Sequence, residues 1–172
     1  YNMAVKMSDI ARSCVLTAMG LMLHYDNDKA ADVKTEETEL DMYEDKLGSF
    51  LVKLSASALS DNDSADVSKL LHNIGDFERI GDHALNIRQS AKEMHEKGLT
   101  FSEHATEEVD LLFSALNEIL TLAMDSFKDD DLDKAARVEP LEQVIDALIA
   151  QIKRKHIERL QAGRCTIELG FI

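Results

Sequence analysis

The sequence has few of the residues that fix a fold through cross-links, rigid turns or large aromatic side chains. Its 172 residues include one proline, no tryptophan and two cysteines, and aromatic residues make up 5%. Cys14 and Cys165 do not form a C-x-x-C pair, and no group of His and Cys residues has the spacing of a zinc site. These absences argue against a disulfide scaffold and a zinc module, and they favour two thiols that stay reduced.

Long apolar runs and basic residues are also scarce. No run approaches the roughly 20 apolar residues of a membrane-spanning helix, and no signal peptide is visible. Nineteen basic residues against 33 acidic ones give a formal net charge of −14. A surface of this charge repels nucleic acid and anionic lipid headgroups and attracts multivalent cations, so we expect no nucleic-acid partner.

Residues that favour helices are abundant in the sequence. Hydrophobic residues make up 45% of it, and Ala, Leu, Met, Lys and Glu, which favour helices, are plentiful. Apolar residues recur every three or four positions over long stretches, which predicts an all-α fold. The predicted helices cover residues 2–24, 29–59, 65–97, 102–128 and 132–161. A sixth helix is expected to start near Arg164 or Cys165.

Polar residues and glycines between these stretches predict where the helices begin and end. Asp28 is predicted to cap the second helix, because a side-chain oxygen at a cap accepts a hydrogen bond from the first turn. Thr100 and Glu103 have the spacing of a capping box for the fourth helix. Gly98 and Gly163 are predicted to end the helices that precede them.

An internal repeat divides the chain. The segment Asp28–Val33, D-K-A-A-D-V, returns 105 residues later as D-K-A-A-R-V at Asp133–Val138. Identity at five of these six positions predicts a duplicated structural unit. We therefore predict two tandem three-helix bundles, residues 1–98 and 99–172, in which the last helix of the second bundle is truncated.

Pairs of carboxylates one helical turn apart recur in register with this repeat. Glu78 and Asp82 lie in the stretch 73–87 of the third helix, and both leave the same side of that helix. The second helix of each unit carries a similar pair: Glu37 with Asp41, and Glu142 with Asp146. Neighbouring helices of a bundle bring such pairs face to face, and carboxylates suit hard or borderline cations. All six residues are therefore predicted metal ligands. The alternative is a solvated acidic stripe that holds Ca²⁺ or Mg²⁺ loosely.

The stretch around the third-helix pair resembles a known family. Residues 77–87, F-E-R-I-G-D-H-A-L-N-I, look like the signature helix of the PhoU family of phosphate-uptake regulators. The resemblance implies two tandem three-helix repeats whose acidic motifs hold polynuclear metal clusters of iron or zinc, with magnesium and manganese left open. It also implies a role in regulating phosphate transport and phosphate signalling, without catalysis.

A narrower resemblance concerns the two ends of the chain. Residues 2–4 and 163–172 resemble the PhoU-like domain at the cytoplasmic C-terminus of bacterial sodium–phosphate cotransporters. This implies a membrane domain before Tyr1, a last helix that continues past Ile172, and a location on the cytoplasmic side of the bacterial cell membrane. The implied partner is a membrane phosphate transporter, fused in the same full-length chain or separate, and homodimerisation is left open.

Three other interpretations remain open from the sequence. A stand-alone PhoU-type regulator would carry the same motifs, and a carboxylate-metal phosphoesterase would use its metals to activate water. A purely structural helical adaptor would bind no metal with useful affinity. No glycine-rich phosphate loop, nucleophile elbow or separate general acid is present, so no catalytic residue is predicted and the protein is not expected to be an enzyme.

Overall fold

The chain folds into helices joined by short turns. The computed structural model describes residues 1–164. Its helices are α1 (Asn2–Leu23), α2 (Asn27–Ser55), α3 (Asp61–Glu96), α4 (Glu103–Asp129), α5 (Leu132–Ala135) and α6 (Val138–Gln161). No strand occurs within residues 1–164, which confirms the all-α fold class. The predicted sixth helix falls on residues 165–172, which lie outside the described residues.

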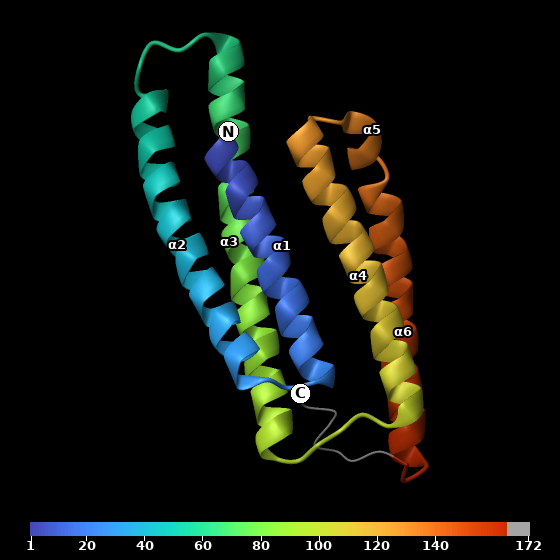
Figure 1. The fold of residues 1–172 in the computed structure, drawn as a ribbon. Helices are drawn as coiled ribbons and strands as arrows, with labels where there is room; N and C mark the ends of the chain where they lie inside the picture. Colours follow the sequence, from blue (N-terminus) through green and yellow to red (C-terminus); the bar gives the residue numbers. More distant parts are fainter. Residues whose placement is uncertain (165–172) are drawn as a thin grey trace. The chain divides into compact units, whose positions relative to one another are not determined.

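These helices belong to two compact units. The first comprises Tyr1–Leu21 and Asp26–Gln89, and the second comprises Met22–Tyr25 and Ser90–Ile172. In the first unit α1, α2 and α3 run alongside one another, and in the second unit α4 and α6 lie side by side (Figure 1). The boundary between the two units falls within α3, between Gln89 and Ser90. The predicted boundary between the two sequence repeats, after residue 98, is a different one and stays a prediction. None of the helices within residues 1–164 is both long enough and apolar enough to span a membrane.

The core of the first unit is built from the apolar stripes of its three helices. Its fully buried side chains include Met7 and Leu21 from α1, Val33 and Leu40 from α2, and Ile74 and Ala84 from α3. Burial of one large aliphatic side chain contributes about 1.5–3 kcal/mol. The core therefore holds α2 against α3 at Leu40. The predicted metal ligands Glu37 and Asp41 lie close to Leu40 in α2.

The Cys14 thiol joins α1 to the backbone of α2. Its S–H donates a hydrogen bond to the Val33 carbonyl, with 3.4 Å between sulfur and oxygen. Burial, followed by the charges of Glu36 and Glu37, raises the pKa of the thiol to about 12. The thiol is therefore neutral at physiological pH, and it acts as a packing group, not as a nucleophile or a ready metal ligand.

The start of α2 differs from the sequence prediction. Its cap is Asp26 and not Asp28, because the Asp26 side chain accepts hydrogen bonds from the backbone N–H groups of Asp28 and Lys29. Asp26 has the extended backbone (φ −140°, ψ 125°) that a cap requires, whereas Asp28 already lies in the first helical turn. Several residues between Tyr25 and Asp28 have capping side chains, and only the backbone decides among them.

The start of α4 also differs from the prediction. Ser102 is the cap, and its hydroxyl accepts a hydrogen bond from the Ala105 N–H at 3.3 Å. The predicted capping box of Thr100 and Glu103 is therefore wrong. Glu103 is the first residue of the helix, and a capping box needs its acidic residue at the third helical position.

The first turn of α5 repeats the capping geometry of α2. Asp131 accepts hydrogen bonds from the N–H groups of Asp133 and Lys134, both at 3.0 Å. The corresponding bonds to Asp26 measure 2.9 and 3.0 Å. Asp26 and Asp131 are 105 residues apart, which is the offset of the sequence repeat. The two helix starts therefore share one capping geometry at the offset of the repeat, and the duplication of the whole three-helix unit stays a prediction.

The predicted helix 132–161 is interrupted. α5 ends at Ala135, and α6 begins only at Val138. The single proline, Pro140, explains the break, because proline has no N–H to donate to the Ala136 carbonyl and its ring crowds that carbonyl. Proline is tolerated in the first turn of a helix, so the chain begins a new helix just before it.

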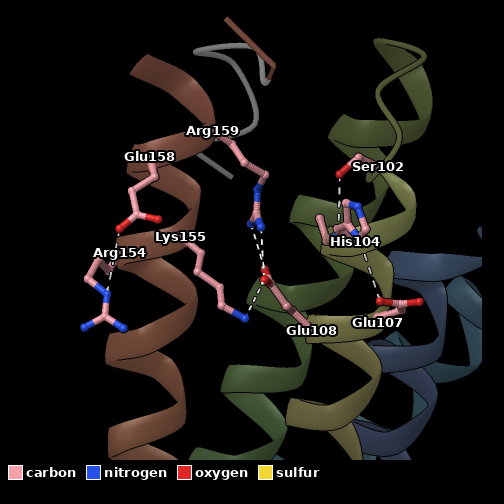
Figure 2. A network of polar contacts seen from close by, with 9 residues as sticks. Ser102, His104, Glu107, Glu108, Arg154, Lys155, Glu158 and Arg159 are labelled. Atoms are coloured by element: carbon pink, nitrogen blue, oxygen red, sulfur yellow. Dashed lines mark hydrogen bonds and ion pairs between the residues drawn. The ribbon is translucent and has the colours of Figure 1, made fainter. Parts of the chain in front are cut away.

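The second unit has a small buried core in its described part. Among residues 99–164, Met124 and Ile145 are the buried apolar residues. An ion-pair network adds to this contact between α4 and α6 (Figure 2). Arg159 donates two hydrogen bonds to the Glu108 carboxylate, at 3.0 and 2.7 Å, and the Lys155 amine lies 3.2 Å from the same carboxylate.

We expect the substitution Glu108→Gln to lower the free energy of unfolding by about 1–3 kcal/mol near neutral pH, because it removes charge-assisted hydrogen bonds from a mostly buried pair. The hydrogen bonds from Arg159, with a further one from Lys155, lower the pKa of Glu108 below its usual 4.5. A carboxylate whose pKa is lower in the folded state stabilises the fold above 4.5, and this contribution disappears as the pH falls below that value.

Denaturation curves at neutral and acidic pH measure this effect. The variant and the wild type should converge in acid, and Glu107→Gln, at a neighbouring exposed position, should match the wild type at both pH values within about 0.5 kcal/mol. A difference between Glu108→Gln and the wild type that does not change with pH would contradict the ion-pair interpretation.

Candidate metal centre

α2 and α3 come into close contact at a glycine. A Cβ atom added at Gly81 of α3 would lie 2.7 Å from Cδ1 of Leu40 and 3.8 Å from Cγ of Glu37, both of α2. The Leu40 side chain is fully buried, so it fills the space above the glycine. The absence of a side chain at position 81 therefore lets α2 side chains reach the backbone of α3.

Four of the predicted ligands flank this contact: Glu37 and Asp41 on α2, and Glu78 and Asp82 on α3. The two glutamates are partly buried, whereas the two aspartates are exposed. The Leu40–Gly81 contact holds the two helices together between these pairs, so their carboxylates lie within electrostatic reach of one another. The structure thus places the second-helix and third-helix motifs on adjacent helices, and their role as metal ligands stays a prediction.

The pKa values of both glutamates reflect this arrangement. Burial, followed by the charge of Asp82 one turn away, raises the pKa of Glu78. Three carboxylates of α2 add to this shift: Asp41, Glu44 and Glu37. Burial, followed by the charge of Asp41 and then by that of Asp82 across the contact, raises the pKa of Glu37. The carboxylates of α2 and α3 around Gly81 therefore repel one another.

Glu44 is a residue of this acidic group that the sequence reasoning missed. It is partly buried, and its Oε1 lies 3.8 Å from the position that a Cβ atom at Gly48 would take. The same added atom would lie 3.9 Å from Cδ1 of Ile74, which belongs to α3. Glu44 therefore also reaches the contact between α2 and α3. The available signal was its position three residues after Asp41, a spacing that places both side chains on one face of a helix.

The third predicted pair belongs to the second unit. Glu142 and Asp146 are exposed on α6, in the second unit. At the 105-residue offset, the counterparts of Glu78 and Asp82 of α3 would fall past Ile172, the last residue of the sequence. The two residues therefore stay predicted ligands, without a facing acidic pair within residues 99–164.

The side chains around Gly81 do not form a ready-made ligand set. Within residues 1–164, no group of three or more His, Cys, Asp or Glu side chains is arranged so that it could hold a metal ion. Binding at this contact therefore requires rotation of the carboxylates toward a common point, and exposed Asp41 and Asp82 have the space to rotate.

The donor atoms at the contact fit an oxygen-bound cation. Carboxylate oxygens are the ligands of Mg²⁺ and Mn²⁺ and also suit iron, whereas structural zinc sites are usually built from Cys and His. The Cys14 thiol is buried and neutral, and His83 is exposed. The residues that would hold a metal here are Glu37, Asp41, Glu78 and Asp82.

The fold and the acidic contact define a helical-bundle protein with carboxylate pairs on adjacent helices. The PhoU domain family matches residues 4–91, just over half of the chain, and this match includes both acidic pairs of the first unit. The chain therefore belongs to the PhoU domain family.

A comparison with curated proteins finds a distant relative of this chain. The chain is 29% identical over 97 residues to the phosphate-specific transport system accessory protein PhoU homolog 1 of Thermotoga maritima. The aligned part is 56% of this chain and 41% of the relative, so the chain spans about two fifths of that protein's length. No solved structure matches the chain significantly.

Proposed function

We propose that this chain is a non-enzymatic regulatory domain that controls phosphate uptake and binds metal through the carboxylates of α2 and α3. Membership in the PhoU domain family supports the regulatory role, as does the name of the Thermotoga maritima relative, an accessory protein of a phosphate-specific transport system. The observation that carries the metal part is the contact at Gly81, around which the charges of the α2 and α3 acidic pairs raise the pKa values of Glu37 and Glu78.

Metal binding would regulate this domain by changing the interaction between α2 and α3. Without a cation, the carboxylates of α2 and α3 repel one another and weaken the contact between the two helices. A bound cation supplies positive charge that reverses the sign of this interaction. Four carboxylates have enough oxygens to share bridging positions, so the proposed occupant is a polynuclear cluster. Iron is the first choice, and zinc, magnesium and manganese are alternative outcomes of a metal analysis.

We further propose that the domain is the cytoplasmic part of a bacterial sodium–phosphate cotransporter, with the transporter as its partner. The resemblance of residues 163–172 to that class of domain supports this assignment. The coding sequence upstream of Tyr1 tests it, because a cotransporter requires several membrane-spanning segments there. If they are absent, the chain is a stand-alone regulator, as the name of the Thermotoga maritima relative would suggest.

Elemental analysis of the purified, metal-loaded protein tests the site. The double substitution Glu78→Gln with Asp82→Asn removes both charges from α3 but keeps the side-chain volumes. We expect metal affinity to fall by at least about 100-fold, because even the loss of groups that only support a metal's ligands costs 10- to 100-fold. Circular dichroism should show that the variant keeps its helices.

The matched control is Asp28→Asn with Asp32→Asn, which removes two exposed charges one turn apart from α2, away from the contact. This variant should retain its metal. An equal loss in both variants would mean that the metal follows total charge only. The variant Glu142→Gln with Asp146→Asn measures independently whether the pair on α6 takes part.

A further inference from the structure

One stretch of the chain is enriched in basic residues. Residues 153–164 contain five of the 19 Lys and Arg residues but only one of the 33 acidic residues. They form the last turns of α6 and the turn that follows it. Anions respond to the local field and not only to net charge. A chain with a net charge of −14 therefore still offers them a cationic region in its second unit.

A cleft of about 530 Å³ opens at this cationic region. It lies between the start of α4 and the end of α6, and three of its lining residues are basic: Lys155, Arg159 and Arg164. Ser102 and His104 line it from the side of α4 (Figure 2). Its volume is within the range of about 300–1,000 Å³ that is usual for small-molecule sites. We refer to it as the α4–α6 cleft.

Two of the basic side chains are held in place before any ligand arrives. The paired hydrogen bonds of Arg159 to Glu108 measure 3.0 and 2.7 Å, and these side chains are 17% and 14% exposed. Lys155 points to the same carboxylate at 3.2 Å. One carboxylate thus fixes two cations, and little conformational entropy remains to be lost when an anion binds beside them.

Two of the three acidic residues of the cleft, Glu108 and Glu158, each have a cationic neighbour, and the third is Glu107. Glu108 lies between Arg159 and Lys155, and Glu158 is 4.0 Å from Arg154. Glu107 lies 3.8 Å from His104. In contrast, the Arg164 side chain makes no ion pair with any of the described residues. A guanidinium group presents several N–H donors in a planar fork that matches the oxygens of phosphate.

We propose that the α4–α6 cleft binds a phosphate group, carried either by inorganic phosphate or by a phospholipid headgroup. Lys155 and Arg164 provide the charge that recognises it, and the Ser102 and His104 side chains line the same cleft. This site lies in the second unit and uses none of the predicted metal ligands, so it does not depend on the metal proposal.

Titration of the metal-free protein with inorganic phosphate, at constant ionic strength and with chloride as the reference, tests the free-phosphate source. We expect saturable binding with a Kd on the order of 1 mM, measured by NMR or calorimetry. Arg164→Gln and Lys155→Gln should each weaken it about five- to tenfold, because each removes a charge-assisted contact. Arg164→Gln disturbs no ion pair of the described residues, so it separates binding from folding.

Lys153→Gln is the matched control, because it removes one positive charge from an exposed position of α6 that does not line the cleft. It should change the affinity by less than about twofold. The Glu78→Gln and Asp82→Asn variant should bind phosphate as the wild type does, so failure of the metal site and failure of this cleft are distinguishable.

Sedimentation with phosphatidylcholine vesicles, with and without phosphatidic acid, tests the lipid source. Binding only to vesicles that contain phosphatidic acid, weakened by Arg164→Gln but not by Lys153→Gln, supports a headgroup in the cleft. The proposal is overturned if neither phosphate nor these vesicles bind. It is also overturned if all single-charge variants lose affinity equally, since that result shows only general electrostatic attraction.

Discussion

We expect a free metal concentration 100 times its Kd to raise the free energy of unfolding of the wild-type protein by about 2.7 kcal/mol, and to have no comparable effect on the Glu78→Gln and Asp82→Asn variant. The gain follows because the metal binds the folded protein and not the unfolded chain, in which the two acidic pairs are not held together. Denaturant titrations with metal and with a chelator measure it.

The order of stability of the wild type and the Glu78→Gln and Asp82→Asn variant should reverse when the metal is removed. In chelator, the variant is expected to be more stable than the wild type by about 0.5–1 kcal/mol, because it relieves repulsion within α3 and between α3 and α2. A carboxyl group whose pKa is raised by folding lowers stability above its ordinary value of 4.5. The advantage of the variant should therefore shrink as the pH falls below 4.5. A metal-free wild type that is the more stable protein at neutral pH would contradict the arrangement around Gly81.

The substitution Gly81→Ala is expected to lower the free energy of unfolding by about 1–3 kcal/mol, although alanine is the better helix former. The added methyl group would lie 2.7 Å from Cδ1 of Leu40, which is fully buried and cannot move away without disturbing its neighbours. Thermal or chemical denaturation measures the loss.

Gly75→Ala is the matched control for this prediction. Gly75 lies in the same helix, and an added Cβ atom there meets no other atom within 4 Å. This change should stabilise the protein by about 0.5–1 kcal/mol, the usual gain from glycine to alanine in a helix. In a Leu40→Ala background, Gly81→Ala should cost less than it does alone. If Gly81→Ala stabilises the wild type as much as Gly75→Ala does, the close contact is absent.

The sequence predicted the helical elements well, because their apolar spacing extends over many residues. It was less successful at their ends. Asp26 and Asp28 have the same side chain, and what selects Asp26 as the cap is its extended backbone, which no local pattern specifies. The break before α6 was available from Pro140, but the apolar spacing on both sides of it concealed the interruption.

The candidate site was predictable only in part. Glu37, Asp41, Glu78 and Asp82 could be paired from their spacing and from the expectation that the second and third helices are neighbours. Glu44 was missed because its distance from Glu78 depends on how α2 packs against α3, and packing is a tertiary property. The α4–α6 cleft could not be foreseen either, since it requires residues about 50 positions apart, such as Glu108 and Arg159, to meet.

The contact between Gly81 and Leu40 limits the paths along which this sequence can evolve. Any side chain that appears at position 81 first meets a filled space, so a larger residue there becomes tolerable only after position 40 has become smaller. The two positions must therefore change in a fixed order, with position 40 first. A lineage that replaced Leu40 and later acquired a side chain at position 81 could not easily return, because the restored leucine would then be the residue without room.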